Sequence, residues 1–214
     1  EAVGALDAAA AVLSFRASLP HWCRPGFTDA RAVEARGIYH PLLASPVPND
    51  VTLACSGLVS GSNASGKSTF IKALAVNGIF AQTIHTCAAR AYRTRFSLVV
   101  TSMAVRDDIE AGESYFITEL KSLRRVLDAV RRADCLCCID EILKGTNTIE
   151  RIAASAAVLG WLCGKPCLCI AATHDIELTR LLADRLDNYH FAERMTEAGM
   201  AFDYRLHDGP SRTR

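Results

Sequence analysis

The nine residues Gly61-Ser62-Asn63-Ala64-Ser65-Gly66-Lys67-Ser68-Thr69 carry the strongest signal in this 214-residue chain. They match the pattern G-x-x-x-x-G-K-[ST], whose mechanism requires a strand before it and a helix after it. Both are expected here, because residues 51–60 are strand-like and a helix is predicted from Ser68 to about Ala81. The alternative interpretation is a plain glycine turn. The pattern in this setting predicts a phosphate-binding loop.

Each residue type in the loop has a role toward a nucleotide. The glycines let backbone N–H groups turn inward around a β-phosphate, and the helix N-terminus adds partial positive charge. Lys67 is expected to reach the β- and γ-phosphates, and Ser68 is expected to ligate Mg²⁺. The other residues expected to contact nucleotide here are Gly61, Ser62, Asn63, Ala64, Ser65, Gly66 and Thr69.

A second motif supplies the carboxylate that a phosphate loop needs for its metal ion. The apolar run over 136–139 ends in Asp140 and Glu141. Asp140 is expected to hold Mg²⁺ through water, and Glu141 to orient and polarise an attacking water. Taken alone, such a pair is also typical of a solvated strand end. Downstream of a phosphate loop, it predicts the hydrolytic centre.

Two further residues narrow the class of nucleotide-binding protein. His174 follows the next buried strand, and it is expected to hydrogen-bond the γ-phosphate region, although a lone histidine there is otherwise structural. Ser114 opens a helix, where it is either a cap or part of an anion site. Such a helix leading into an Asp-Glu strand is typical of ABC-class ATPases. The chain has no Asn-Lys-x-Asp stretch for guanine, which favours ATP.

Strand-like and helical segments alternate along the chain. Strands are expected over 96–101, 136–139 and 167–172, and helices over 2–19, from about 113, over 148–162 and from about 175. Alternation over 189–193 and 202–206 predicts a C-terminal β-hairpin. This order predicts an α/β P-loop NTPase of the ABC-ATPase class, with a mostly parallel central sheet flanked by helices. The helix from about 113 is expected to bury Phe116, Leu120, Leu123, Leu127 and Val130.

Composition and charge exclude several classes. Half of the residues are hydrophobic, and the formal charge of +1 argues against holding nucleic acid by bulk charge. No apolar run approaches the ~20 residues of a membrane helix. Glu1 opens neither a signal peptide nor a complete chain, so a piece of a longer protein is expected. The nine cysteines are expected to be buried structural thiols in a reducing, cytoplasmic setting.

Several blocks of the sequence resemble the ATPase domain, or domain V, of the MutS family of DNA mismatch-repair proteins. The resemblance runs from about residue 38 to 207 and includes His40-Pro41, Asn63 in the loop, and Gly145-Thr146. Its other blocks are 47–50, 81–82, 113–119, 140–148 and 172–178. The family typically has Gly-Pro-Asn-Met-Gly-Gly-Lys-Ser-Thr at the loop and Gly-Arg at positions 143–144. These departures indicate a divergent bacterial MutS-like branch.

The resemblance implies a homodimer through the ATPase face, with nucleotide at the interface. Ser114 would reach the γ-phosphate bound by the partner's Lys67, with Asn147 and Thr148 near that interface, and Gln82 would contact nucleotide. Residues 1–30 would be the helical tail of a preceding lever domain, and 31–214 the ATPase domain. Double-stranded DNA would be bound through domains missing from this fragment.

Two other functions remain open at this point. One is an ABC-class motor serving transport or chromosome structure, and the other is a regulatory nucleotide-binding module with little turnover. The blocks at His40 and Gly145 argue against the first, and the presence of Glu141 argues against the second. The leading expectation is ATP-driven dimer closure that controls DNA binding, with ATP and Mg²⁺ as cofactors and no membrane segment in this fragment.

Overall fold

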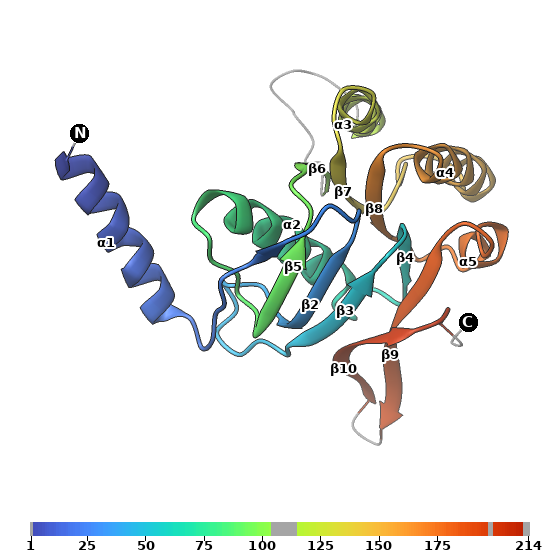
Figure 1. The fold of residues 1–214 in the computed structure, drawn as a ribbon. Helices are drawn as coiled ribbons and strands as arrows, with labels where there is room; N and C mark the ends of the chain where they lie inside the picture. Colours follow the sequence, from blue (N-terminus) through green and yellow to red (C-terminus); the bar gives the residue numbers. More distant parts are fainter. Residues whose placement is uncertain (1, 104–114, 197–198, 212–214) are drawn as a thin grey trace.

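The computed structural model describes residues 2–103, 115–196 and 199–211. These residues form two β-sheets, one of four strands and one of six. Helix α2 (Lys67–Thr83) packs in the core between the smaller and the larger sheet. Helices α3 (Tyr115–Val130), α4 (Thr148–Cys163) and α5 (Glu177–Leu181) cover the other face of the larger sheet (Figure 1). The larger sheet is therefore covered on both faces.

The larger sheet has six strands in the order β10-β9-β4-β8-β7-β6. All neighbouring pairs are parallel except the antiparallel pair β9 and β10. This confirms the predicted mostly parallel sheet and the C-terminal hairpin. The strands are β4 (Gly57–Ser60), β6 (Leu98–Ser102), β7 (Cys135–Asp140), β8 (Cys167–Ala172), β9 (Asp187–Thr196) and β10 (Gly199–Asp208).

Strand β7 illustrates why a buried parallel strand is a continuous apolar run. Its side chains alternate between the two faces of the sheet, and both faces are covered. Leu136 and Cys138 enter the core shared with α2 and the smaller sheet. Cys135, Cys137 and Ile139 enter the core shared with α3 and α4. Neither face has room for polar residues until the strand ends.

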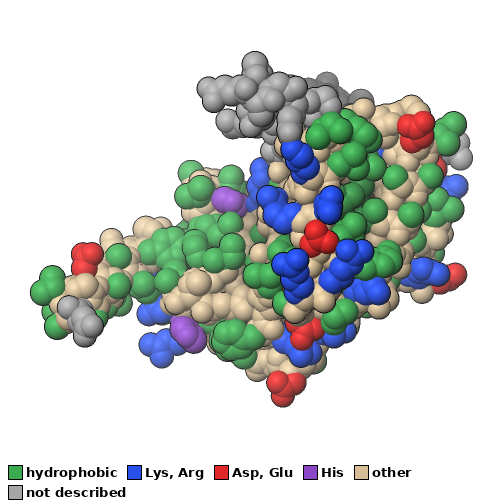
Figure 2. All heavy atoms as spheres, turned by 90° about the horizontal axis from the view of Figure 1, so that it is seen from above, with side chains coloured by type: hydrophobic (Ala, Val, Ile, Leu, Met, Phe, Trp, Pro, Cys, Tyr) green, Lys and Arg blue, Asp and Glu red, His purple; other side chains and the backbone are tan. Residues whose placement is uncertain are grey.

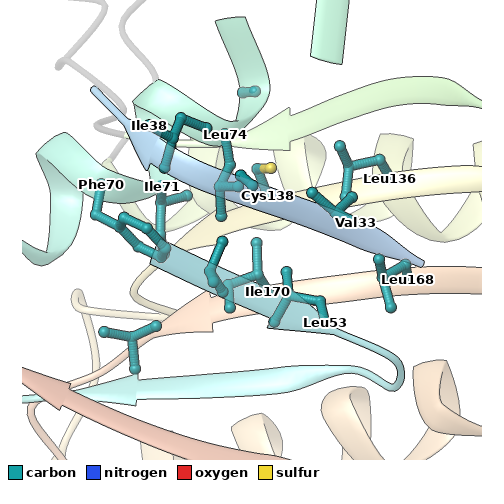
Figure 3. Packing of buried hydrophobic residues seen from close by; sticks show 14 of the residues in the cluster. Val33, Ile38, Leu53, Phe70, Ile71, Leu74, Leu136, Cys138, Leu168 and Ile170 are labelled. Atoms are coloured by element: carbon teal, nitrogen blue, oxygen red, sulfur yellow. The ribbon is translucent and has the colours of Figure 1, made fainter. Parts of the chain in front are cut away.

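The core between the two sheets joins them into one body, as Figure 3 shows. Burying one such aliphatic side chain contributes roughly 1.5–3 kcal/mol. The smaller sheet is therefore held on the larger one by a substantial hydrophobic contact. Its labelled members are Val33, Ile38 and Leu53 from the smaller sheet, Phe70, Ile71 and Leu74 from α2, and Leu136, Cys138, Leu168 and Ile170 from the larger sheet.

The smaller, four-stranded sheet was not predicted. Its order is β1-β5-β2-β3, and its strands are β1 (Gly26–Phe27), β2 (Val33–Ile38), β3 (Asn49–Leu53) and β5 (Ala91–Thr94). The prediction of one strand-like segment over 51–60 was wrong. A turn at 54–56 splits it into β3 and β4, which belong to different sheets.

The helical predictions hold with one correction. Along α3, Leu123 and Val130 are buried as expected, but Leu120 is 38% exposed, and Val126 is buried instead. A straight α-helix has 3.6 residues per turn, whereas alternating steps of four and three residues average 3.5. A stripe with this spacing therefore drifts around the helix, away from the face that packs on the sheet, over four turns.

Helix α1 (Ala2–Ser18) extends away from both sheets (Figure 1). None of its residues is buried. Only its last turns contact the body, where Phe15 packs beside Leu19 and Tyr39, and Arg16 Nε donates to Thr86 Oγ1 over 2.8 Å. Among the described helices, none has the length and apolar character needed to cross a membrane.

The cysteines are free thiols, and most are buried. The predicted buried, structural role of the strand cysteines agrees with their place in the cores on the two faces of the larger sheet. Cys55 departs from the prediction because it is exposed, and Cys23 and Cys163 are half-buried.

Candidate functional site

The phosphate-loop sequence lies where the prediction requires, between the end of β4 and the start of α2. Gly66 precedes the first helical residue with a φ of +112°, and Gly61 has a φ of +142°. L-residues with a Cβ rarely adopt this conformation. A Cβ on Gly61 would also lie 3.0 Å from the carbonyl oxygen of Phe191. The two glycines therefore allow the tight curve of the loop.

Lys67 folds back over its own loop. Its Nζ donates to the carbonyl oxygens of Gly61 and Ser62, both at 2.7 Å, and the residue is only 5% exposed. Burial lowers the pKa of the Lys67 ammonium, and the nearby charge of Asp140 acts in the opposite direction. The Lys67 ammonium group thus lies across the loop, and it is close enough to Asp140 for the two charges to interact.

Asp140 reaches the same place from β7. Strands β4, β8 and β7 are adjacent and parallel, so the end of β4 and the end of β7 lie at one edge, two strand spacings or about 10 Å apart. Asp140 Oδ1 is buried and has no hydrogen-bond partner among the described residues. An unpaired buried carboxylate oxygen is costly unless a ligand satisfies it. This oxygen fits a hard cation such as Mg²⁺, for which Ser68 on α2 is a second candidate ligand.

Glu141 has an unusual backbone and two charged neighbours. Its φ is +61°, and its N–H donates to the Ala172 carbonyl at 3.1 Å. Its carboxylate, 8% exposed, contacts Lys144 Nζ at 2.5 Å and His174 Nδ1 at 3.3 Å. Left-handed backbone at a non-glycine residue costs of order 1–3 kcal/mol and clusters at functional sites. The backbone thus turns the carboxylate toward Lys144 and His174.

His174 stands beside this carboxylate on the loop after β8. Burial is the main cause that lowers its pKa, and the cations Arg151, Lys67 and Lys144 act in the same direction, whereas Asp175 opposes them. Asp175 is itself held by Arg151 through two contacts of 2.8 and 2.6 Å. Because its pKa is lowered, His174 is mostly a neutral imidazole at pH 7.

Glu119 is a buried residue on α3 that was not predicted to belong to the site. Its two carboxylate oxygens accept from the backbone N–H groups of Lys144 at 3.1 Å and Gly145 at 3.2 Å. It therefore ties α3 to the loop that carries Lys144. The only signal for Glu119 in the sequence is its place in the 113–119 block. Its burial and its contacts with the backbone cannot be read from the sequence.

A cavity of about 390 Å³ extends from the loop toward the smaller sheet. Asn49 joins the two sides, because its side chain donates to the carbonyl of Tyr204 and accepts from the N–H of Leu206. Most residues on this side of the cavity lie in the loop that joins β2 to β3. The lining includes Tyr39, His40, Leu43 and Val47 from the smaller-sheet side, Phe191 and Tyr204 from the hairpin, residues 63–70 and Ala73 from the loop and α2, and Glu141 and Lys144.

Not every predicted residue comes to this site. Gln82 lies at the far end of α2, where its side chain donates to Gly78 O at 2.8 Å and accepts from Ser97 N at 2.9 Å. Ser114 is outside the described residues. Asn147 caps α4 by accepting from the N–H of Glu150 at 3.0 Å, and Thr148 is the first residue of that helix.

These features define a class of protein: an α/β fold whose mostly parallel sheet presents a glycine-rich loop and an acidic pair at one edge, beside a cavity. The model of the family described as MutS domain V matches residues 57–214. The chain belongs to this family, which confirms the resemblance found in the sequence.

Curated relatives agree with the family match. A DNA mismatch repair protein MutS of Thermus thermophilus is 32% identical over 196 residues, covering 89% of this chain and 24% of the relative. Another, of Natronomonas pharaonis, is 33% identical over 219 residues, covering 97% and 25%. A third, of Erythrobacter litoralis, is 30% identical over 227 residues, covering 99% and 26%. The chain thus spans about a quarter of the length of these relatives.

Proposed function

We propose that this chain is an ATP-binding and ATP-hydrolysing domain of the ABC class, belonging to a MutS-like DNA repair protein. One observation carries the proposal: Lys67 from the start of α2 meets the unpaired Asp140 Oδ1 and the Glu141 carboxylate from the end of β7 at one edge of the sheet, and Lys67 and Glu141 line the same cavity. A cation, a metal-ligand oxygen and a base beside a glycine-rich turn are the parts that phosphoryl transfer requires.

Binding of the triphosphate would use the loop over 61–69. Its backbone N–H groups and the start of α2 favour anions. Lys67 would exchange its two carbonyl acceptors for the β- and γ-phosphate oxygens. The apolar side of the cavity, near Leu43 and Val47, would take the adenine ring.

Ser68 and Asp140 would hold Mg²⁺, which when bound neutralises charge on the phosphate oxygens. Glu141 would accept a hydrogen bond from the attacking water and polarise it. His174, neutral at pH 7, would donate a hydrogen bond near the γ-phosphate. Each of these roles is assigned to a side chain at the carboxyl edge of the larger sheet.

The ion pair between Lys144 and Glu141 bears on turnover. A carboxylate held by an ammonium at 2.5 Å is less available to a water molecule. Lys144 also lines the cavity, so a bound phosphate would compete with the Glu141 carboxylate for the Lys144 ammonium group. This contact also favours a second candidate function, a nucleotide-binding regulatory module that turns over slowly.

The wider proposal concerns the dimer and DNA. Two copies would close on ATP through the ATPase face, with Ser114 of each copy facing the γ-phosphate bound by the other. Residues 1–30 would belong to a preceding lever domain and 31–214 to the ATPase domain, with double-stranded DNA held by other parts of a longer, cytoplasmic protein. The family and the names of the relatives support this proposal.

The testing experiment is release of phosphate from ATP by the purified chain, measured with Mg²⁺ and with EDTA. Mg²⁺-dependent release that Lys67→Ala abolishes is expected. ATP binding without release supports the regulatory module. Absence of both binding and release contradicts the proposal.

A shared site is tested by mixing two inactive variants, Ser114→Ala and Lys67→Ala. In a mixed dimer, one composite site keeps both residues, so activity above that of either variant alone is expected. A mixture no more active than its components contradicts the shared site.

A further inference from the structure

A band of cationic side chains covers the outer face of α3 and continues onto the neighbouring loops. We call it the α3 basic face. The view from above in Figure 2 shows Lys and Arg side chains gathered on this side of the molecule, around few acidic ones. Its members are Arg31, Arg95, Lys121, Arg124, Arg125, Arg131 and Arg132.

Two aspartates tie the face together. Asp134 contacts Arg31 at 3.3 Å and Arg95 at 2.8 Å. Asp128 contacts Arg124 at 3.7 Å and Arg131 at 3.1 Å. Each carboxylate is shared by two guanidinium groups, so each group of three keeps one positive charge and orients its arginines.

The charge of the face differs sharply from that of the chain. The seven named cations and the two named aspartates, all among the described residues, sum to a formal charge of +5, whereas the whole chain has a formal charge of +1. The remainder therefore carries −4. The positive charge is concentrated on one side, and this local excess is what attracts a polyanion.

The geometry of the face suits a phosphate backbone. From Lys121 to the end of α3 at Val130 the helix rises about 14 Å, a length over which double-stranded DNA carries about eight charges. Six of the seven cations are arginines, whose planar fork matches phosphate oxygens.

The side chains are accessible to such a ligand. The exposed fractions are 84% for Arg124, 63% for Arg131 and 42% for Arg31. None of the seven lines the nucleotide cavity. The face is therefore separate from the proposed ATP site, and the two sites can be occupied at the same time by different ligands.

We infer that the α3 basic face binds the phosphate backbone of double-stranded DNA, without reading its sequence. This adds a DNA contact on the ATPase domain itself to the contacts proposed for other parts of the longer protein. It does not depend on ATP binding, and the two sites can fail independently.

The test is fluorescence anisotropy of a labelled 20-base-pair duplex titrated with the chain, at salt concentrations from 50 to 200 mM. The variant Lys121→Gln/Arg124→Gln/Arg132→Gln removes three exposed cations. Because each phosphate contact contributes about 0.9 to the slope of log K against log salt, the slope should flatten by up to about 2.7. Affinity at 50 mM salt should fall at least tenfold.

The matched control Arg180→Gln/Arg185→Gln/Arg205→Gln removes the same charge from α5, its neighbouring loop and β10. It should retain the parent salt slope within about one unit. A single reversal, Arg124→Glu, should weaken binding in the same direction, with an unchanged melting temperature.

Three outcomes overturn the inference. The first is no duplex binding at 50 mM salt. The second is an equal loss in the α3 and control variants. The third is that poly-glutamate displaces the labelled duplex as well as unlabelled duplex does, when the two competitors are compared at equal concentration of negative charge. The surface would then bind acidic polypeptides equally well.

Discussion

The two sheets contribute different sides of the same cavity. The larger sheet supplies the charged groups Lys67, Asp140 and Glu141 at the carboxyl ends of its parallel strands or just beyond them. The loop that joins β2 to β3 of the smaller sheet supplies a mainly apolar wall around Tyr39 and Val47. Ligands bind at the carboxyl edge of open α/β sheets because strand ends and helix starts meet there. The strand order of the larger sheet thus determines where the charged groups meet, whereas the opposite wall of the cavity depends on how the smaller sheet packs on the larger one.

The largest effect is expected at the larger sheet. Glu141→Gln keeps the size of the side chain but removes the charge that polarises water. Turnover of ATP should fall about 10²- to 10⁴-fold, while ATP affinity should change little. Single-turnover phosphate release and equilibrium ATP binding measure the two quantities.

The control for this change is Glu177→Gln, an exposed acid on α5. It should leave turnover unchanged. If Glu141→Gln retains more than a tenth of the parent rate, the base lies elsewhere and the larger sheet loses its assigned chemistry.

In the smaller sheet, the expected effect is on stability. Leu53 is fully buried in the core between the sheets, and Leu53→Ala should lower the free energy of unfolding by about 2–5 kcal/mol. Thr52→Ala, exposed on the same strand, should cost less than about 1 kcal/mol. Urea titration followed by circular dichroism gives both values. Equal losses for the two variants would mean that the smaller sheet is not docked by its core.

A smaller change is expected from the contact between Lys144 and Glu141. The Lys144 side chain is 48% exposed, so the ion pair contributes on the order of 1 kcal/mol. Lys144→Ala should free the carboxylate and raise turnover roughly two- to fivefold, and Lys144→Arg should keep the parent rate. A lower rate in Lys144→Ala would show that Lys144 assists the reaction instead of restraining Glu141.

The smallest effect is a pH dependence. Burial lowers the pKa of His174 below its usual 6.5, so the unfolded chain binds a proton more readily than the folded one. Its contribution to stability is complete above pH 6.5 and is lost as pH falls from there through the folded pKa. Urea titrations at pH 7.5 and 5.5 should show a smaller pH difference in His174→Gln than in the parent chain. An identical difference would contradict the lowered pKa.

The same comparison explains what the sequence could predict. The larger sheet was predictable because β7 and β8 are uninterrupted apolar runs and the loop over 61–69 has a known mechanism. The smaller sheet was missed because β1 has two residues and β2 contains Gly37, whose φ is +62°. The boundary between β3 and β4 was missed because only the short bend over 54–56 separates the two strands.

The site was predictable to the same extent. Motif residues were identified because each carries chemistry at a fixed spacing. Lys144 and Glu119 were not identified, because their roles come from contacts with Glu141 and with backbone N–H groups that depend on tertiary packing. Gln82 was predicted at the nucleotide from the resemblance alone, but its helix carries it away from the loop.

The most direct test of the account is the equilibrium dissociation constant for ATP with Mg²⁺, measured by titration calorimetry on the chain and on Lys67→Ala. Hydrogen bonds to a charged group contribute about 1.5–3 kcal/mol, so the variant should bind about 10- to 100-fold more weakly. Lys165→Ala, whose Nζ lies over the Trp161 ring, should bind like the parent chain. Equal affinity of the parent chain and Lys67→Ala would contradict the claim that the loop over 61–69 grips the triphosphate.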